Sequence, residues 1–429
     1  MKLAILMCLL VLASPVSGWV QDPDPQKPAE EEQAPEGQAP ETATPEEKPP
    51  EERAPKKEEE AESRRVYWDD GLWIENLFGD GRLKIGGQVQ NDTAGFVSDG
   101  TQPVEIENGV EWRRARVYAL GTIGERWAYK FQWDLADRPY LKDAWLQLKI
   151  QIFDGKVWLR GGRFSTTFGL ENDGRSGDLL FMEQGLTAAF VPPQETGVLL
   201  HSESTNRRWD ISFSSSADEL ECLLCSVVGI AGRYSTHFDF EGKEKLLHVG
   251  VNYSRRWTSD DSVVYSQRPE SHIAPYFVDT GSILAQWVDT GLFEAAFIEG
   301  PFSVQTEVVV AGVKPNEGPR PIFTGYYVSG AYTLTGESRP YRRRLGLIGG
   351  ISPARSWREG GRGAFEIALR YSRIDLNSQD VAGGALRDSS FALNWYPTAH
   401  IKLSFNTIRA ARQDWDPVWV FQARLQVMY

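Results

Sequence analysis

The sequence predicts an all-β protein: a transmembrane antiparallel β-barrel of about 16 strands, preceded by a disordered, acidic, proline-rich N-terminal segment. Three observations predict this fold. Apolar and polar residues alternate with a period of two, aromatic residues gather at strand ends, and the chain begins with a secretion signal. The predicted divisions are a signal peptide over 1–18, a Pro/Glu-rich linker over 19–65 and a barrel over 66–429.

The first residues have the composition of a secretory signal. Lys2 precedes the apolar run 3–13, and the small residues Val16 and Gly18 are placed for cleavage before Trp19. A helix that spans a bilayer needs about 20 apolar residues, so this run is too short, although a short membrane anchor is the alternative. We therefore expect the mature chain to leave the cytoplasm.

The segment 21–63 is predicted to be disordered. It contains 15 acids against 5 bases, a balance of −10, together with nine prolines. Such a chain cannot bury enough apolar surface to offset its ordering entropy, so it is a periplasmic spacer by default. The alternative is contact with a cationic partner or with the cell wall. Because most of the net charge of −13 lies in this tail, only −6 remains for 66–429, and no basic nucleic-acid-binding domain is present.

A strand with one apolar and one polar face recurs along the rest of the chain. In the first clear example Phe131, Trp133 and Leu135 alternate with Lys130, Gln132 and Asp134. The same alternation is found in the stretches 145–150, 247–253, 365–371, 401–406 and 419–429. The period predicts strands in which every second side chain faces the same way.

Turns separate these strands in a short-then-long rhythm. Short turns rich in Gly and Pro alternate with longer connections, notably 165–193 and 257–288. The connection 340–361 is long where the rhythm requires a short one, which leaves a margin of two strands in the count of about sixteen. This spacing matches strands of about 10 residues in a transmembrane barrel.

A soluble β-sandwich would show the same alternation, so aromatic positions decide between the two. Aromatic residues cluster at strand ends, as in the pairs Trp127 with Tyr129 and Trp395 with Tyr396. Rings at these positions are typical of the girdles at a membrane interface. The last strand also ends on an aromatic residue, Tyr429, as outer-membrane barrels commonly do. The apolar faces are therefore expected to contact lipid.

Ordered motifs add a family resemblance. The matching stretches are 83–88 (LKIGGQ), 113–116 (RRAR), 129–136 (YKFQWDLA), 142–145 (KDAW), 164 with 168–171 (FGLE), 181–183 (FME), 299–305 (EGPFSVQ), 334–341 (LTGESRPY), 369–372 (LRYS) and 393–396 (LNWY). Over residues 67–429 the chain resembles the O/P-type porins, which include phosphate-selective and pyrophosphate-selective porins of bacterial outer membranes. The resemblance implies a sixteen-stranded barrel, usually a homotrimer, whose third long loop constricts the lumen. It also implies that arginines along the lumen guide anions.

Alternation assigns basic and acidic residues to the lumen without help from the family. The predicted pore-lining bases are Lys84, Arg114, Arg116, Lys130, Lys149, Arg160, Arg233, Arg370, Lys402 and Arg424. The predicted lumenal acids are Asp134, Asp210, Glu294, Glu307 and Glu366. This balance of about +5 would concentrate anions in the pore, above all if Arg113, Arg114 and Arg116 face open water. The alternative is that bases and acids on neighbouring strands pair with one another.

The predicted constriction loop, 165–193, has the opposite charge. It carries Glu171, Asp173, Asp178 and Glu183 against Arg175, a balance of −3, and it contains no lysine. A phosphate trap built on a loop lysine is therefore not supported. Glu183 matches a recurrent family position, and we expect it to anchor the loop to the barrel wall.

Two cysteines follow the predicted signal peptide. Cys222 and Cys225 form a C-x-x-C pair, for which a local disulfide and two free thiols are the alternatives. A zinc site would need two further ligands that no nearby His or Cys provides, so no metal or other cofactor is expected.

The predicted function is that of an outer-membrane porin, a passive diffusion channel for small anionic or polar solutes, with phosphate and polyphosphate as candidates. Its expected partners are outer-membrane lipid and further copies in a homotrimer. The alternatives are a general non-selective porin and a structural barrel that anchors the membrane to the wall. A hydrolase is disfavoured because no G-x-S-x-G motif accompanies the five histidines, which are His201, His237, His248, His272 and His400.

Overall fold

The computed structural model describes residues 65–77, 79–98, 100, 102–152, 155–204, 206–215, 228–241, 245–258 and 262–429. The predicted signal peptide, the predicted linker up to residue 64, and Cys222 and Cys225 lie outside these residues. Among the described helices, none has the length and apolar character needed to cross a membrane.

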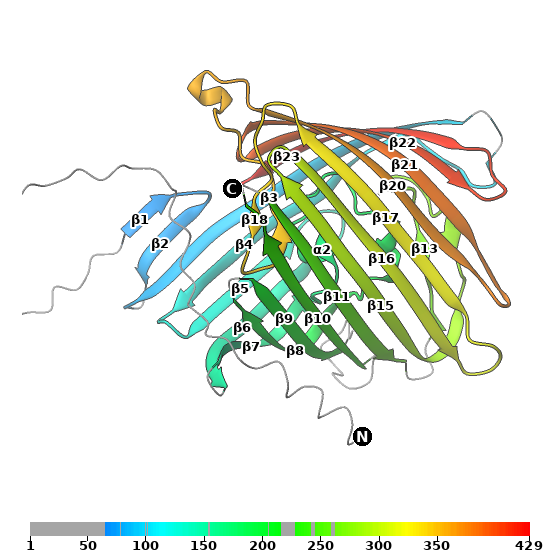
Figure 1. Cartoon of the computed structure of the whole chain (residues 1–429), viewed down its shortest axis with the longest axis horizontal. Coiled ribbons are helices and arrows are strands. Elements are labelled where there is room, and N and C mark those ends of the chain that lie inside the picture. The colour runs from blue at the N-terminus through cyan, green and yellow to red at the C-terminus, as the bar shows by residue number, and fades with distance from the viewer. Residues whose placement is uncertain are drawn as a thin grey trace, which may run out of the picture.

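Sixteen antiparallel strands form a closed barrel (Figure 1). They are β3 (Gly81–Ser98), β4 (Gly109–Ile123), β5 (Trp127–Asp134), β6 (Tyr140–Ile152), β7 (Gly155–Ser165), β8 (Gln194–Glu203), β9 (Arg207–Ser215), β10 (Val228–Asp239), β11 (Lys245–Trp257), β15 (Ile283–Glu299), β16 (Phe302–Pro315), β17 (Ile322–Thr333), β20 (Ala364–Ser378), β21 (Val381–Thr398), β22 (Ile401–Arg412) and β23 (Val418–Met428). Each strand pairs with the next, and β23 pairs with β3 to close the sheet. The predicted fold class is confirmed.

The two faces of the wall differ as the alternation predicted. Along β17, Tyr326 and Val328 are exposed on the outside, whereas Tyr327 and Ser329 are buried inside. In β16 the exposed residues Val308 and Val310 alternate with buried ones in the same way. The outer surface is therefore an apolar band suited to lipid, and the inner wall carries most of the polar residues.

One part of the inner wall is apolar as well. On the strands from β15 to β23, at the end with the long loops, inward residues such as Phe323, Ile374 and Leu386 are fully buried. They are covered by Phe190 from the loop 166–193 and by Tyr265 from the loop 258–282. Each large apolar side chain buried in this way contributes about 1.5–3 kcal/mol. Both loops are thus held against one side of the barrel by a hydrophobic core.

Short elements occur inside these two loops. The loop 166–193 contains α2 (Leu170–Asp173) and the 3-10 helix η1 (Leu186–Phe190). The loop 258–282 contains β12 (Ser262–Val263), β13 (Ser266–Gln267) and β14 (Val278–Asp279). β13 pairs with β14, which makes the second loop a small hairpin of its own.

The first part of the long connection after β17 also folds inward, and in it β18 (Tyr341–Arg342) pairs with β19 (Leu347–Ile348). The 3-10 helix η2 (Trp357–Glu359) follows, has no buried residue and protrudes from the barrel (Figure 1). Leu347 packs with Leu170 of the first loop and Ala296 of the wall. This hairpin explains the break in the short-then-long rhythm at 340–361, because the connection adds an inward segment and no strand to the barrel.

A hairpin precedes the barrel. β1 (Arg65–Trp68) pairs with β2 (Leu72–Leu77), which in turn pairs with the start of β3. The indole of Trp68 stacks on the Tyr429 ring at 6.5 Å, and the Gly87 and Tyr429 backbones exchange two hydrogen bonds. The hairpin therefore extends the sheet at the place where the last strand ends.

Gly162 of β7 provides a test of the register between β6 and β7. Its φ is +130°, and an added Cβ would overlap the carbonyl oxygen of Ala144, whereas a Cβ on Gly161 would meet open space. We expect Gly162→Ala to lower the free energy of unfolding by about 1–3 kcal/mol, because the new side chain is strained and crowded. Gly161→Ala should change it by less than about 0.5 kcal/mol. Denaturant unfolding of both variants checks this, and equal losses would contradict it.

Candidate functional site: the inner wall and its loops

The structure places all ten predicted bases on the inner face of the barrel. Four of them show the range of surroundings. Arg116 pairs with Asp134 at 2.7 Å, Lys130 pairs with Asp143 at 2.8 Å, and Lys402 donates to the Leu179 carbonyl oxygen at 2.6 Å. Lys84, near the β1–β2 hairpin, pairs with the turn residue Asp70 at 3.1 Å. Most of these bases are therefore already engaged.

A β-bulge brings one further arginine inside. The pairing of β3 with β4 shifts register between Gln90, opposite Arg114, and Asn91, opposite Trp112. The extra residue is Arg113, and its guanidinium donates to both carboxylate oxygens of Glu183, at 2.9 and 3.0 Å. Strict alternation would place adjacent residues on opposite faces, so the bulge is what allows Arg113 and Arg114 to share the lumen.

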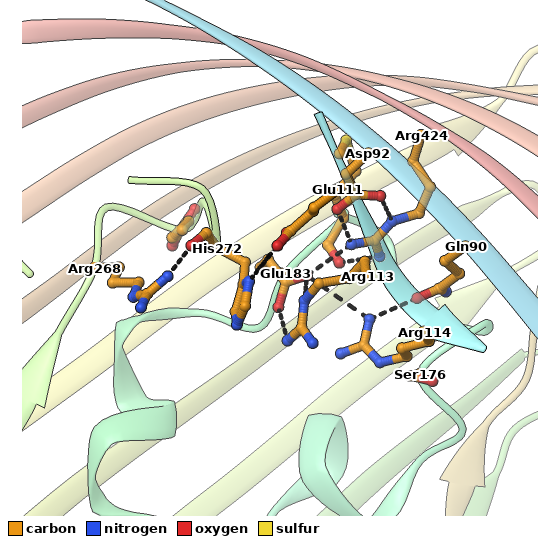
Figure 2. A network of polar contacts seen from close by, with 12 residues as sticks. Gln90, Asp92, Glu111, Arg113, Arg114, Ser176, Glu183, Arg268, His272 and Arg424 are labelled. Carbon is orange, nitrogen blue, oxygen red and sulfur yellow. Dashed lines mark hydrogen bonds and ion pairs between the residues drawn. The ribbon is translucent and has the colours of Figure 1, made fainter. Parts of the chain in front are cut away.

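Glu183 is the centre of this cluster, which Figure 2 shows. Besides Arg113, it pairs with Arg424 at 2.6 Å and lies 3.7 Å from Arg114. Burial by itself would raise the pKa of this carboxyl, but the three guanidinium groups hold the pKa well below its usual range. Arg424 also pairs with Asp92 of β3 at 2.6 Å. The loop is thus clamped to the wall by one carboxylate among three arginines, which supports the anchoring role expected for Glu183.

Glu183→Gln should loosen the loop 166–193. The substitution removes a charge that three buried arginines require, so amide hydrogen exchange across 176–186 should increase by about tenfold or more, the equivalent of about 1.4 kcal/mol. Because its pKa is depressed, the wild-type carboxylate contributes fully above about pH 4.3, and the contribution is lost only as pH falls further towards the depressed value. Exchange mass spectrometry at pH 7 and at about pH 3 measures both effects. Glu337→Gln, in the connection after β17 and only half-buried, is the control, and equal exchange in both variants would contradict the clamp.

The other charged residues of the loop also face cations. Asp173 lies 3.2 Å from Arg208 and 3.3 Å from Arg233, and Asp178 pairs with Arg175 at 2.9 Å and with Arg342 at 2.8 Å. Arg342 belongs to the inward hairpin β18–β19. The net charge of −3 in this loop is therefore neutralised by arginines of the wall and of the hairpin.

A second loop crosses the lumen. Glu270, in the loop 258–282, pairs with Arg370 at 2.6 Å, and Glu171 of the first loop lies 3.3 Å from the same guanidinium. Farther along, His272 lies 2.9 Å from Glu111 of β4 (Figure 2). Loop 258–282 is thus fastened to two separate strands of the wall, β20 and β4.

The five predicted lumenal acids lie inside, and the wall adds four more that the sequence analysis missed. Those are Asp92, Asp143, Glu195 and Asp388. Glu294 is typical of the predicted set, because it pairs with Arg233 at 2.6 Å and is fully buried. The wall also adds bases outside the predicted set, Arg113, Arg208 and Arg256, so the lumenal excess of about +5 stays a prediction. Pairing between bases and acids, the alternative, describes most of the inner wall.

Some of the residues that the sequence analysis missed could have been found from strand alternation, and others could not. Arg208 has the same parity as Asp210 on β9 and pairs with it at 2.8 Å, so alternation could have identified it. Asp92 lies on β3 opposite Arg424 and could have been found by the same rule once the register was known. Glu270 lies in a long loop, where alternation gives no information.

Positive charge remains unpaired mainly on the wall formed by β6 and β7. Arg160 donates to the Gln147 side-chain oxygen at 2.9 and 3.0 Å and lies 4.2 Å above the Trp145 ring. Lys149 lies 5.7 Å from the Trp158 ring. Within the described ranges, no carboxylate forms an ion pair with either of these two bases. The apolar cluster that holds the two loops lies on β15 to β23, whereas charged residues of the loop 166–193 reach β4, β9 and β10.

No three His, Cys, Asp or Glu side chains in the described part of the chain meet as a set of metal ligands.

Comparisons with known proteins agree with this architecture. A family model described as "Phosphate-selective porin O and P" matches residues 83–429. Porin O of Pseudomonas aeruginosa is 25% identical over 374 residues, which cover 76% of this chain and 82% of that protein. A Caulobacter vibrioides protein named only as uncharacterized is 28% identical over 358 residues, 76% of this chain and 68% of that one.

Among solved structures, the loop L8 deletion mutant of OmpT, an outer membrane protein of Vibrio cholerae, has a TM-score of 0.54 at 11% identity. The match covers 81% of this chain and 99% of that one, and at this identity it bears on the fold alone. Because the family model spans the whole barrel, this chain belongs to the family of phosphate-selective porins O and P and is an outer-membrane porin.

Proposed function

We propose that the protein is a passive channel for small anionic or polar solutes and that it prefers anions. The supporting observation is the pair of bases without carboxylate partners on β6 and β7, Lys149 and Arg160. Solutes would pass along this wall, since the apolar residues of the two long loops pack on β15 to β23. Low-dielectric walls focus the field of such charges and raise the local concentration of anions.

Phosphate and polyphosphate are the candidate solutes. The family's description points to anions of this class, and a guanidinium suits phosphate through its planar set of donors. The loop 165–193 contains no lysine, so discrimination between phosphate and other anions would depend on arginines of the wall. A general non-selective porin is the second candidate, favoured by the extensive pairing of the inner wall.

Planar-bilayer recording tests both. With a salt gradient across the membrane, the reversal potential of an anion channel should be shifted from zero towards the equilibrium potential of the anion. Added phosphate should reduce the chloride current if phosphate and chloride share a path. A reversal potential near zero would favour the general porin. Cation preference, or the absence of conductance steps, would contradict the proposal.

We also propose the parts of the organisation that lie outside the described residues. The chain would carry a signal peptide over 1–18 and a periplasmic spacer over 19–65, and it would assemble as a homotrimer, as the family resemblance implies. Deleting 21–63 separates a channel from an anchor, because a channel should conduct unchanged and an anchor should lose its tethering to the wall. Mass analysis with and without reductant would decide between a Cys222–Cys225 disulfide and free thiols.

A further inference from the structure

A buried carboxyl group on β21 has no hydrogen-bond donor. Asp388 faces the lumen and is fully buried, and among the described residues no donor reaches either of its carboxylate oxygens. Buried polar groups are ordinarily hydrogen-bonded, and a buried carboxylate without a partner is costly. An orphaned group of this kind in an otherwise densely paired wall needs an explanation.

The surroundings of Asp388 are known on every side. On β20 the residue directly opposite is Ser372, and on β22 it is Ala410. Leu386 and Ile408 lie next to it in the apolar core, and Arg412, opposite Leu386 on β22, lies 4.4 Å over the Trp415 ring. The nearest ionised groups are Glu270 of the loop 258–282 and Arg370 of β20.

Glu270 lies directly over this position. Its carboxylate accepts hydrogen bonds from Ser372, opposite Asp388, and from Ser390, two residues farther along β21, the latter at 2.7 Å. Its backbone carbonyl oxygen accepts a bond from Gln422 of β23 at 3.1 Å. The Glu270 carboxyl group is thus buried against the two serines that neighbour Asp388 on the wall.

Arg370 is the cation closest to Asp388 and Glu270, and its guanidinium also interacts with other carboxylates. Its guanidinium pairs with Glu270 and with Glu171, whose neighbour Glu307 adds a fourth carboxyl group to the same region. If Asp388 were ionised, three carboxylates would meet one guanidinium in a site without water access. One bound proton would neutralise the Asp388 carboxylate, which accepts no hydrogen bond. Two carboxyl groups that share a site commonly hold one proton between them.

We propose that Asp388 and Glu270 share one proton, and that this proton fastens the loop 258–282 to the inner wall and is lost, with release of the loop, as pH rises. A protonated Asp388 becomes a donor towards Glu270, which otherwise has only acceptor atoms to offer. The carboxylate of Glu270 remains paired with Arg370. Widening of the pore on release rests on the proposed channel function, whereas fastening of the loop does not.

The direction of the pH dependence follows from proton counting. The fastened state binds one proton more than the released state, in which both carboxyl groups are solvated and ionised at neutral pH. Each unit of rising pH therefore shifts the equilibrium towards release by about tenfold through the transition. Asp388→Asn keeps a neutral side chain of the same shape and should abolish this dependence.

Hydrogen exchange of peptides covering 265–279 provides the test, with the full-length protein in lipid vesicles. At each pH between 7 and 10 the wild type is compared with Asp388→Asn, so that the intrinsic pH dependence of exchange cancels. The ratio of the two exchange rates should rise by about tenfold per pH unit through the transition. The control is Asp380→Asn in the exposed turn of the same hairpin, which should behave as wild type. A ratio that is constant with pH would overturn the proposal.

A second measurement does not depend on the variant folding. Infrared spectra of the wild type at pH 7 should contain a protonated carboxyl band that shifts when the protein is labelled with isotopic aspartate or glutamate. The absence of such a band would overturn the proposal. So would slower exchange on adding sodium or calcium at constant pH, because a cation and not a proton would then occupy the site.

Planar-bilayer recording tests whether release of the loop changes conductance. Conductance of the wild type should increase at alkaline pH, and that of Asp388→Asn should not. If no variant conducts at all, the channel proposal fails, while the exchange and infrared results still decide whether the proton is present.

Discussion

Arg370→Met should lower the free energy of unfolding by about 3–5 kcal/mol, the largest effect on stability that we expect for one substitution in this protein. The Arg370 side chain is 1% exposed and pairs with Glu270 and Glu171, which are buried to the same degree. It also donates to the Glu183 carbonyl oxygen at 3.0 Å and lies 4.2 Å above the Phe181 ring. Removing the cation leaves two carboxylates buried without a counter-charge and loosens both inward loops at once.

Unfolding of the protein in lipid vesicles by guanidinium chloride, followed by tryptophan fluorescence, measures this loss of stability. The matched control is Arg373→Met on the same strand, whose side chain is 43% exposed and pairs with the half-buried Asp375. An exposed pair contributes about 0–1 kcal/mol, so the control should lose no more than that. Similar losses in the two variants would show that the buried network does not stabilise the barrel beyond a surface ion pair.

Arg160→Glu should produce the largest change in ion selectivity. The substitution replaces an unpaired positive charge on the proposed solute path by a negative one, close to Gln147 and Trp145. A unit charge about 4 Å away is worth about 1 kcal/mol even in water, so the permeability ratio of anion to cation should fall by about fivefold or more. Reversal potentials in a salt gradient give this ratio directly.

Arg126→Glu is the control for the change in net charge. Arg126 is exposed in the short turn between β4 and β5, outside the inner wall, and should leave selectivity nearly unchanged. Raising the salt concentration should also weaken the effect of Arg160→Glu, because screening shortens the range of the field. If both variants shift the reversal potential equally, the proposed path along β6 and β7 is wrong.

Much of the inner wall could be predicted because the rule that assigns it is local. In a strand the side chains alternate between two faces, so a base such as Arg233, between apolar residues that face lipid, has to point inward. The same rule would have found Arg208. It fails at Arg113, because a β-bulge adds one residue to β4 and the cause of that bulge lies in the pairing with β3.

The contacts of the loops could not be predicted in this way. Glu270 has no periodic pattern around it, and its partner Arg370 is 100 residues away. The inward course of β18 and β19 depends on Leu347 meeting Leu170, which belongs to another loop. Such contacts depend on the closed shape of the barrel, which brings distant loops into one small volume.

The sequence by itself determined that the chain is a sixteen-stranded barrel with an apolar outside and charged inside, because strand periodicity and interfacial aromatics are properties of short stretches. The tertiary structure alone decided which charges remain available in the lumen. Glu183 neutralises Arg113 and Arg424, from which it is separated by 70 and 241 residues. Pairing requires contact within about 4 Å, and only the folded loops bring these groups that close.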